Sequence, residues 1–187
     1  MPLTNTTING GFMAVGIVRR IDELGRIVIP KEMRKTMRLQ VGDEMEICAS
    51  DDGLTLRRYS GFQSATSCCK AVAKLLAEAT DKDVLLVSAN EVVVAEGKNK
   101  KTYQSQRITD SFSNELRKRK EEFLQGEEVS RIFENDVSTP AFALVKPVVA
   151  SGDFLGAVLL LSDSKPSDSD DKYLHFCTEL ISATFTE

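Results

Sequence analysis

The chain has 187 residues, of which 42% are hydrophobic and 28% charged, and its formal net charge is −4. This composition is ordinary for a globular protein, and no apolar run approaches the roughly 20 residues that a membrane-spanning helix needs. We expect no export signal in the first twelve residues. The four cysteines do not have zinc-site spacing. We therefore expect a cytoplasmic protein with reduced thiols, no metal, no cofactor and no membrane partner.

Positive charge is concentrated in one short segment of this acidic chain. Residues 19–38 contain seven basic and three acidic residues, a balance of +4. Residues 61–187 contain 15 basic and 20 acidic residues, a balance of −5. This asymmetry favours an anionic partner for the N-terminal part of the chain alone.

The N-terminal part is predicted to be a small β-rich module. Residues 1–12 carry no charge and are expected to form a flexible tail. β-Branched runs predict strands, Pro30 is suited to the start of a helix, and the sequence SDDG is typical of a hairpin. The expected elements are strands at 15–21 and 26–29, a helix at 30–37 and a hairpin of strands at 45–49 and 54–58.

Size limits what this module, predicted at 13–58, can do alone. It contains no tryptophan, and neither a disulfide nor a metal is expected to support it. Domains this small bury little apolar surface and often need oligomerisation to fold. We therefore expect two copies of the module to share one core.

Beyond a predicted linker at 59–63, the pattern changes to that of an α+β domain covering 64–187. Apolar residues at helical spacing alternate with strand-like runs, which suggests a sheet covered by helices. The expected helices are 64–79, one around 108–116 and one near 168–185, and the expected strands are 84–88, 92–96, 142–150 and 155–162.

The short helix predicted after Pro30 has a basic stripe. Its four members lie at positions i, i+3, i+4 and i+7, and so fall on one face: Lys31, Arg34, Lys35 and Arg38. Met33 and Met37 fall on the opposite side, where they can enter a core. Arginine suits phosphates and base edges, so the stripe favours nucleic acid. The alternative is a merely solvated face, which is our interpretation of the later RKRKEE run at 117–122.

The string GIVRRIDELGRIVIPKEMRKTMRLQVGDEMEI, and above all its first 17 residues, resembles the DNA-binding module of the AbrB/SpoVT family of bacterial transition-state and sporulation regulators. The resemblance implies a swapped-hairpin β-barrel dimer that binds double-stranded DNA. The residues that it implies for DNA contact are Arg19, Arg26, Arg34 and Lys35, with Arg20 and Arg38 beside them. Lys35 stands where many relatives have arginine, so a phosphate contact is expected there. Asp22 and Glu23 either pair with nearby arginines or are solvated.

The second half resembles a GAF-type sensory domain, mainly through AFALVKPVVASGDFLGAVLLLSD. GAF domains often bind a small molecule, but this sequence has no diagnostic ligand motif. We hypothesise a pocket bounded by residues between Gln104 and Pro140, for an effector that the sequence does not identify.

These observations predict a DNA-binding transcription regulator of sporulation or another developmental transition. Association through both modules would give a homotetramer with two DNA-binding ends. No enzyme activity is expected, because the sequence has no P-loop, nucleophile elbow or histidine–carboxylate pair. The alternatives are an antitoxin-type autoregulator, or a ligand sensor whose N-terminal module serves only in assembly.

Overall fold

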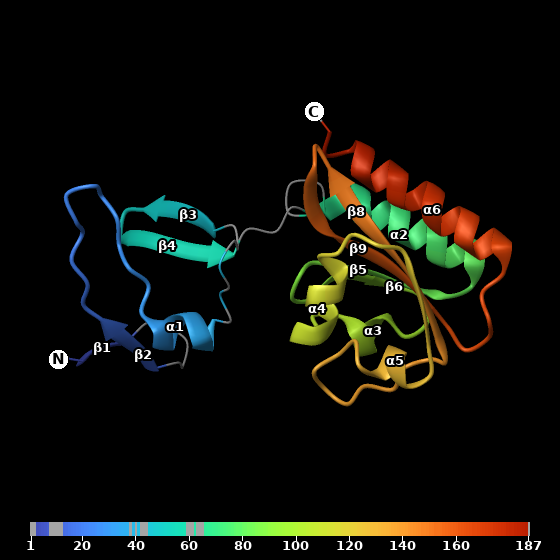
Figure 1. Ribbon diagram of the computed structural model, residues 1–187, viewed down its shortest axis with the longest axis horizontal. Helices are drawn as coiled ribbons and strands as arrows, with labels where there is room; N and C mark the ends of the chain where they lie inside the picture. Colours follow the sequence, from blue (N-terminus) through green and yellow to red (C-terminus); the bar gives the residue numbers. More distant parts are fainter. Residues whose placement is uncertain are drawn as a thin grey trace. The chain divides into compact units, whose positions relative to one another are not determined.

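The computed structural model describes residues 3–7, 13–37, 39, 41, 45–58, 62 and 66–186. The chain forms two compact units, which are Met1–Tyr59 and Ser60–Glu187 (Figure 1). In the part of the chain that is described, no helix has both the length and the apolar character to cross a membrane.

The described part of the N-terminal unit contains two small antiparallel ladders and one short helix. Strand β1 (Leu3–Thr7) pairs with β2 (Met13–Ile17), and β3 (Met45–Ser50) pairs with β4 (Gly53–Arg58). Helix α1 (Lys31–Thr36) begins directly after Pro30, whose fixed φ and missing N–H suit the start of a helix. The predicted helix and hairpin are therefore confirmed.

Other predictions for this unit were wrong. Residues 3–7 form a strand within the predicted flexible tail, where three threonines favour extended backbone. The strand predicted at 15–21 ends at Ile17, and residues 26–29 form no strand. A segment of β-branched residues forms a strand only where a second strand is available for hydrogen bonding. None lies beside 26–29 in the described part of this single chain.

Apolar side chains of the N-terminal unit are mostly exposed. In its described part no large hydrophobic side chain belongs to a buried core, and Val28 remains 72% exposed. Met33 and Met37, predicted to be able to enter a core, are 38% and 43% exposed. The exposed set is Val18, Ile21, Leu24, Ile27, Val28, Met33, Met37, Val41, Ile47, Leu54 and Leu56. Within one copy, the described part of this unit therefore buries little apolar surface.

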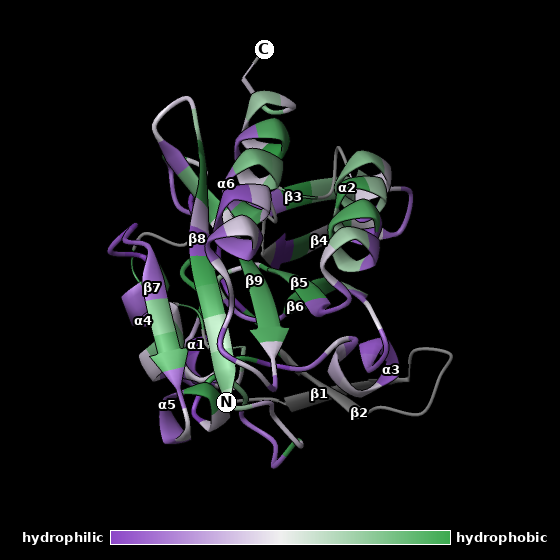
Figure 2. Ribbon diagram, turned by 90° about the vertical axis from the view of Figure 1, so that its right-hand side faces the viewer, coloured by the Kyte–Doolittle hydropathy of each residue, from purple (hydrophilic) through white to green (hydrophobic). Residues whose placement is uncertain are grey.

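The C-terminal unit is built on a five-stranded antiparallel sheet in the order β6-β5-β9-β8-β7. Helices α2 and α6 pack side by side on one face, and the short helices α3, α4 and α5 cover the other (Figures 1 and 2). The strands are β5 (Asp83–Val87), β6 (Val92–Glu96), β7 (Glu122–Gln125), β8 (Phe142–Ala150) and β9 (Asp153–Ser162). The helices are α2 (Thr66–Thr80), α3 (Lys100–Tyr103), α4 (Asp110–Leu116), α5 (Glu127–Ser130) and α6 (Asp168–Ala183).

Two apolar cores lie on the two faces of this sheet. Successive strand residues point to opposite faces, so Leu159 and Leu161 enter the core beneath α4, whereas Val158 and Leu160 enter the core beneath α2 and α6. Because both faces are covered, β9 is apolar along most of its length (Figure 2). This explains why the sequence LGAVLLL predicts a central strand.

The predicted α+β class and the long elements of this unit are confirmed. The sequence did not predict α3, β7 or α5, each of which is four residues long. Four residues make barely one turn of a helix or two repeats of a strand, which is too short for a hydrophobic pattern to be distinguished.

The predicted linker at 59–63 contains a core residue of the C-terminal unit. Phe62 is fully buried, and its ring meets that of Phe185 edge-on with a centroid separation of 6.0 Å. It also packs on Gly156, where an added Cβ would lie 2.5 Å from Phe62 Cε2. The linker assignment is therefore wrong at Phe62, because burial of a large aromatic side chain stabilises it in the core.

We predict that Phe62→Ala lowers the free energy of unfolding of the C-terminal unit by about 3–5 kcal/mol, because it leaves a cavity in a closed core. Phe62→Leu keeps most of the apolar volume and should cost roughly half as much or less. Urea denaturation followed by circular dichroism measures both. Equal, negligible effects of the two substitutions would show that Phe62 belongs to a linker after all.

Candidate nucleic-acid interface

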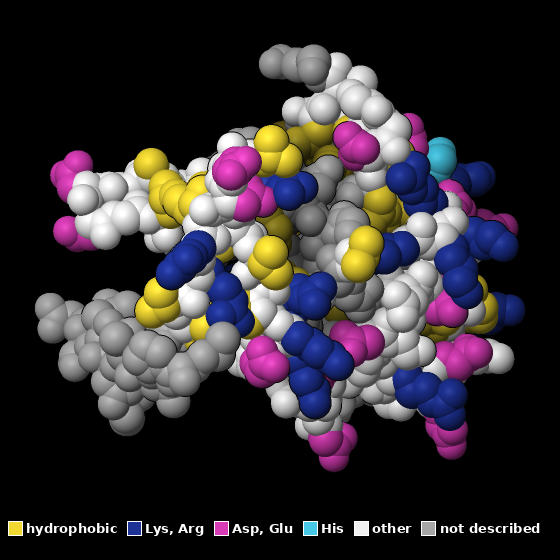
Figure 3. Space-filling view, turned by 60° about the vertical axis from the view of Figure 1, so that its left-hand side comes forward, with side chains coloured by type: hydrophobic (Ala, Val, Ile, Leu, Met, Phe, Trp, Pro, Cys, Tyr) yellow, Lys and Arg dark blue, Asp and Glu magenta, His cyan; other side chains and the backbone are white. Residues whose placement is uncertain are grey.

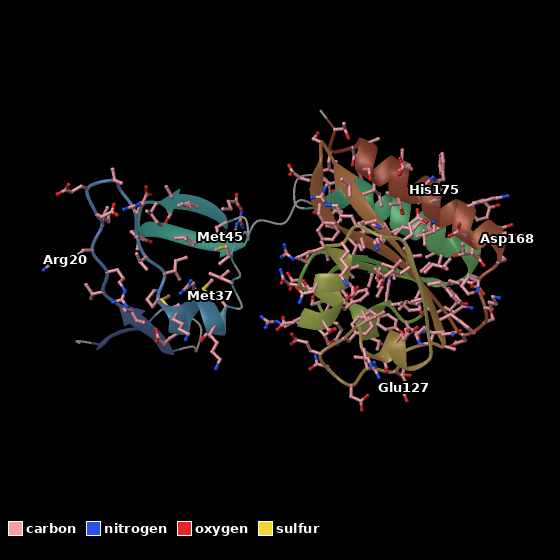
Figure 4. All side chains as sticks on the ribbon, viewed as in Figure 1. Arg20, Met37, Met45, Glu127, Asp168 and His175 are labelled. Atoms are coloured by element: carbon pink, nitrogen blue, oxygen red, sulfur yellow. The ribbon has the colours of Figure 1, made fainter. Side chains whose placement is uncertain are left out.

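The predicted DNA-binding residues lie on two segments of the N-terminal unit. Arg19, Arg20 and Arg26 are exposed on the loop that precedes α1, and Arg20 points away from the chain (Figure 4). Lys31, Arg34 and Lys35 are exposed on α1 itself; the seventh residue, Arg38, lies outside the described residues. In Figure 1 the tip of the loop is well separated from α1.

Helix α1 presents its basic side chains together. Positions i, i+3 and i+4 share one face of a helix, which places Lys31, Arg34 and Lys35 side by side. Within the described residues these three form no ion pair, and they remain exposed to solvent. Figure 3 shows Lys and Arg side chains, in dark blue, exposed on this side of the molecule. The face is available to an anionic partner.

The loop before α1 contains a tight turn at residues 22–26. The Asp22 N–H donates to the Arg26 carbonyl at 3.1 Å, and the Gly25 N–H donates to the Asp22 carbonyl at 3.0 Å. Gly25 has a φ of 76°, which glycine adopts without the steric cost of a side chain. The Asp22 side chain reinforces the turn, since its Oδ1 accepts from the N–H groups of Leu24 at 3.0 Å and Arg26 at 2.8 Å.

The same carboxylate binds the side chain of Arg26. Arg26 Nε donates to Asp22 Oδ2 at 2.7 Å, while the side chain of Arg26 remains 70% exposed. The backbone N–H of Arg26, followed by its guanidinium, holds the pKa of Asp22 below its usual value, although partial desolvation opposes this. Of the two alternatives that the sequence left open for Asp22, the structure shows pairing with an arginine.

A further arginine of the N-terminal unit forms a salt bridge with a glutamate on the neighbouring strand. Arg57 Nε on β4 donates to Glu46 Oε2 on β3 at 2.6 Å. This hydrogen bond raises the pKa of Arg57 and lowers the pKa of Glu46. The pair supports the hairpin as a cross-strand contact.

The basic run at 117–122 is largely engaged within the C-terminal unit. Lys118 binds Glu115 at 2.6 Å, and Arg119 donates to the Gly152 carbonyl at 2.7 Å. Glu121 accepts from buried Lys146 at 2.7 Å. Burial alone would lower the pKa of Lys146, but the hydrogen bonds to Glu121 and to a second carboxylate raise it. These internal contacts favour the interpretation of this run as a structural, solvated surface.

Residues 104–140, expected to bound an effector pocket, contribute both to a buried core and to the lining of two cavities. Between the sheet and the layer formed by residues 104–140, side chains such as Ile108, Phe112 and Ile132 form a buried core. A groove of about 410 Å³ remains beside β7, lined among others by Glu115, Phe123 and Glu128. A polar cavity of about 530 Å³ lies where β5 begins and β9 ends, and its lining includes Asp83, Asn99, Tyr103, Ser138 and Asp163.

Tyr103 closes one side of the polar cavity. Its hydroxyl donates to the Ser138 carbonyl at 3.1 Å, and its ring stacks on Phe133. Burial, followed by the negative charges of Asp83 and Asp163, raises the pKa of Tyr103 to about 12. The hydroxyl therefore stays protonated and acts as a hydrogen-bond donor at neutral pH.

Comparison with known families assigns each half of the chain. Residues 66–183 match the family described as stage V sporulation protein T C-terminal, transcription factor. Residues 18–64 match the family described as antidote-toxin recognition MazE, bacterial antitoxin. The chain thus combines an AbrB/MazE-type module with a domain of the SpoVT C-terminal type.

Two curated proteins of Bacillus subtilis (strain 168) align with most of this arrangement. Stage V sporulation protein T is 34% identical over 80% of this chain and 84% of its own length. The transition state regulatory protein AbrB is 29% identical over 55% of this chain and 92% of its own length. The chain belongs to the AbrB/SpoVT family, as the sequence predicted, and specifically resembles stage V sporulation protein T.

A solved structure also overlaps the C-terminal unit. It is the cofactor binding GAF domain of the nutrient sensor CodY from Clostridium difficile, with a TM-score of 0.47 and 20% identity, covering 62% of this chain and 82% of that chain. The GAF type of the C-terminal unit stays a prediction.

Proposed function

We propose that this protein is a transcription regulator of bacterial sporulation or another developmental transition that binds double-stranded DNA through its N-terminal unit. The observation that carries the proposal is the exposed face of Lys31, Arg34 and Lys35 on α1, in a module related to AbrB and stage V sporulation protein T. We propose no catalytic role for the protein.

Charge makes DNA a suitable partner for this face. Basic side chains that contact phosphates release condensed counterions, so binding depends steeply on salt and needs little base recognition. The remaining chain is acidic and would be repelled by the same polyanion. Binding is therefore confined to one end of the chain.

The exposed apolar side chains of the N-terminal unit support a shared core. We propose that two copies form the swapped-hairpin barrel that the resemblance implies, which would cover side chains such as Ile27, Val28 and Leu54. Dimerisation would also place two sets of basic residues on one assembly. The DNA site is then expected to have approximate two-fold symmetry.

We predict that Arg34→Ala combined with Lys35→Ala weakens DNA binding roughly tenfold or more at moderate salt, because phosphate contacts are lost from both copies. The slope of log affinity against log salt should decrease by about 1 for each lost phosphate contact. Fluorescence anisotropy with a labelled duplex measures both quantities.

The matched control removes the same charge from the other unit. Lys118→Ala combined with Lys120→Ala should leave the affinity and the salt slope almost unchanged. Equal losses in the two double variants would contradict an interface centred on α1.

The C-terminal unit offers a second contact surface. Exposed apolar side chains follow the outer faces of the adjacent helices α2 and α6, where Leu75 and Phe176 are 65% and 68% exposed and are accompanied by Tyr173 and Leu180. The spacing of 173, 176 and 180 is that of a helix–helix seam. We propose that this face joins DNA-binding dimers into a tetramer, which increases avidity for DNA.

We predict that Leu75→Glu combined with Phe176→Glu halves the mass of the assembly, because the charges cannot be buried in an apolar helix contact. Size-exclusion chromatography with light scattering measures the mass. Lys172→Glu, an exposed charge change on the same helix, should leave it unchanged. A monomeric wild-type protein would contradict both proposed contacts.

An effector of the C-terminal unit would fit the polar cavity, which residues 138–140 help to line, better than the more open groove beside β7. The lining of this cavity by carboxylates, hydroxyls, an amide and the ammonium groups of Lys82 and Lys98 suits a small polar molecule. We predict that a ligand of this kind raises the thermal unfolding midpoint of the full chain, as preferential binding to the folded state requires. Asn99→Leu should abolish the shift, and a screen of polar metabolites without any shift would oppose a sensory role.

An antitoxin remains the second candidate, because residues 18–64 match the MazE description. That match covers only the DNA-binding module. The folded C-terminal unit, with its match to a transcription factor family, favours the regulator. Co-purification of a toxin with the native protein would reverse this preference.

A further inference from the structure

We propose that Asp22 is a positioning residue for DNA recognition, which orients Arg26 so that the outer edge of its guanidinium faces the nucleic acid. This inference rests on the proposed DNA-binding function and assigns a role to an acidic residue next to the basic surface. An acidic side chain in that place would otherwise be expected to weaken binding, because it repels phosphates.

The geometry leaves a defined part of Arg26 available. A guanidinium has five N–H groups, one on Nε and two on each Nη. Asp22 Oδ2 binds Nε at 2.7 Å, while the side chain of Arg26 remains 70% exposed. Among the described residues, the hydrogen bond to Asp22 engages Nε alone, which leaves the two Nη groups as a planar fork. Such a fork fits two adjacent acceptors, as on the guanine edge or on a phosphate.

Asp22 is itself well fixed. Its other oxygen accepts from the backbone N–H groups of Leu24 and Arg26, and its own backbone closes the turn with Arg26. The carboxylate is therefore tied to the backbone that carries the arginine. A side chain ordered before binding loses less conformational entropy when it meets DNA. This gain can exceed the repulsion that one partly neutralised carboxylate exerts.

The test distinguishes positioning from simple electrostatics by whether removal of the Asp22 charge weakens or tightens DNA binding. Asp22→Asn removes one negative charge but keeps an acceptor for the turn, whereas Glu23→Gln removes the same charge from the adjacent exposed position. We expect Asp22→Asn to weaken binding by about threefold to tenfold, the range for one side chain that must be ordered on binding. Glu23→Gln should leave binding unchanged or tighten it. The duplex is one selected from a random pool by the full-length wild-type protein.

A double-mutant cycle shows whether Asp22 acts through Arg26. In an Arg26→Ala background, Asp22→Asn should no longer weaken binding. The same loss in both backgrounds, or an Asp22→Asn variant that binds as tightly as Glu23→Gln, would overturn the proposal. Arg26→Lys retains the charge without the fork and should weaken binding like Asp22→Asn, which provides a second variant should Asp22→Asn not fold.

Modified duplexes locate the acceptor. Guanines are replaced one at a time by 7-deazaguanine, and phosphates by methylphosphonates. At one such position the wild type and Glu23→Gln should lose affinity, while Arg26→Ala should not. If no position separates the wild type from Arg26→Ala, Arg26 makes no such contact and the proposal fails.

A readout without DNA distinguishes this proposal from the proposed function. In NMR spectra of the free protein, the Arg26 Nε–H signal should be protected from solvent exchange in the wild type and in Glu23→Gln, and unprotected in Asp22→Asn. If the Arg26 Nε–H is protected but the protein binds no DNA, the proposed DNA-binding function is refuted, whereas the proposed orientation of Arg26 by Asp22 is retained. Equal exchange in all three variants would refute the orientation, even in a protein that binds DNA.

Discussion

Burial of apolar surface is the constraint on which the rest of this structure depends, and the two units meet it differently. The C-terminal unit closes a core on each face of its sheet, with Leu159 and Leu160 on opposite sides. The N-terminal unit leaves residues such as Val28 and Ile47 exposed. A unit that cannot bury its apolar side chains alone gains stability from a second copy. The proposed association of two copies would therefore serve the stability of the fold as well as the function.

Exposed positive charge is the basis of the DNA-binding role that we propose for the N-terminal unit. The basic residues of α1 need no partner within the described part of the chain, since they stand in solvent on one face of a short helix. Arg26 is different, because a carboxylate four residues earlier holds it. The described part of the unit therefore combines exposed basic side chains on α1, suited to a polyanion, with two arginines, Arg26 and Arg57, that carboxylates hold. In the C-terminal unit, by contrast, basic residues such as Lys146 are paired with carboxylates.

Sequence patterns predicted the long elements well and the short ones poorly. Strands β8 and β9 and helix α6 span several periods of an apolar pattern, which local sequence alone records. The four-residue elements α3, β7 and α5 exist because neighbouring segments supply their contacts. The strand expected at 26–29 failed for the converse reason, since β-branched residues form a ladder only beside another strand. Phe62 was assigned to a linker because its neighbours resemble one.

By itself, the sequence determined the family, the α+β class, the acidic and basic halves and the basic stripe of α1, since these follow from residue identity and spacing. Only the tertiary structure decided that Phe62 belongs to a core, that Ile108 and Phe112 belong to another, and that Asp22 binds Arg26. The core contacts join residues that are far apart in the sequence, so the order of residues does not reveal them. The contact between Asp22 and Arg26 depends on the turn that contains Gly25. Charge and hydropathy follow from the order of the residues, whereas contacts between distant residues depend on how the chain folds.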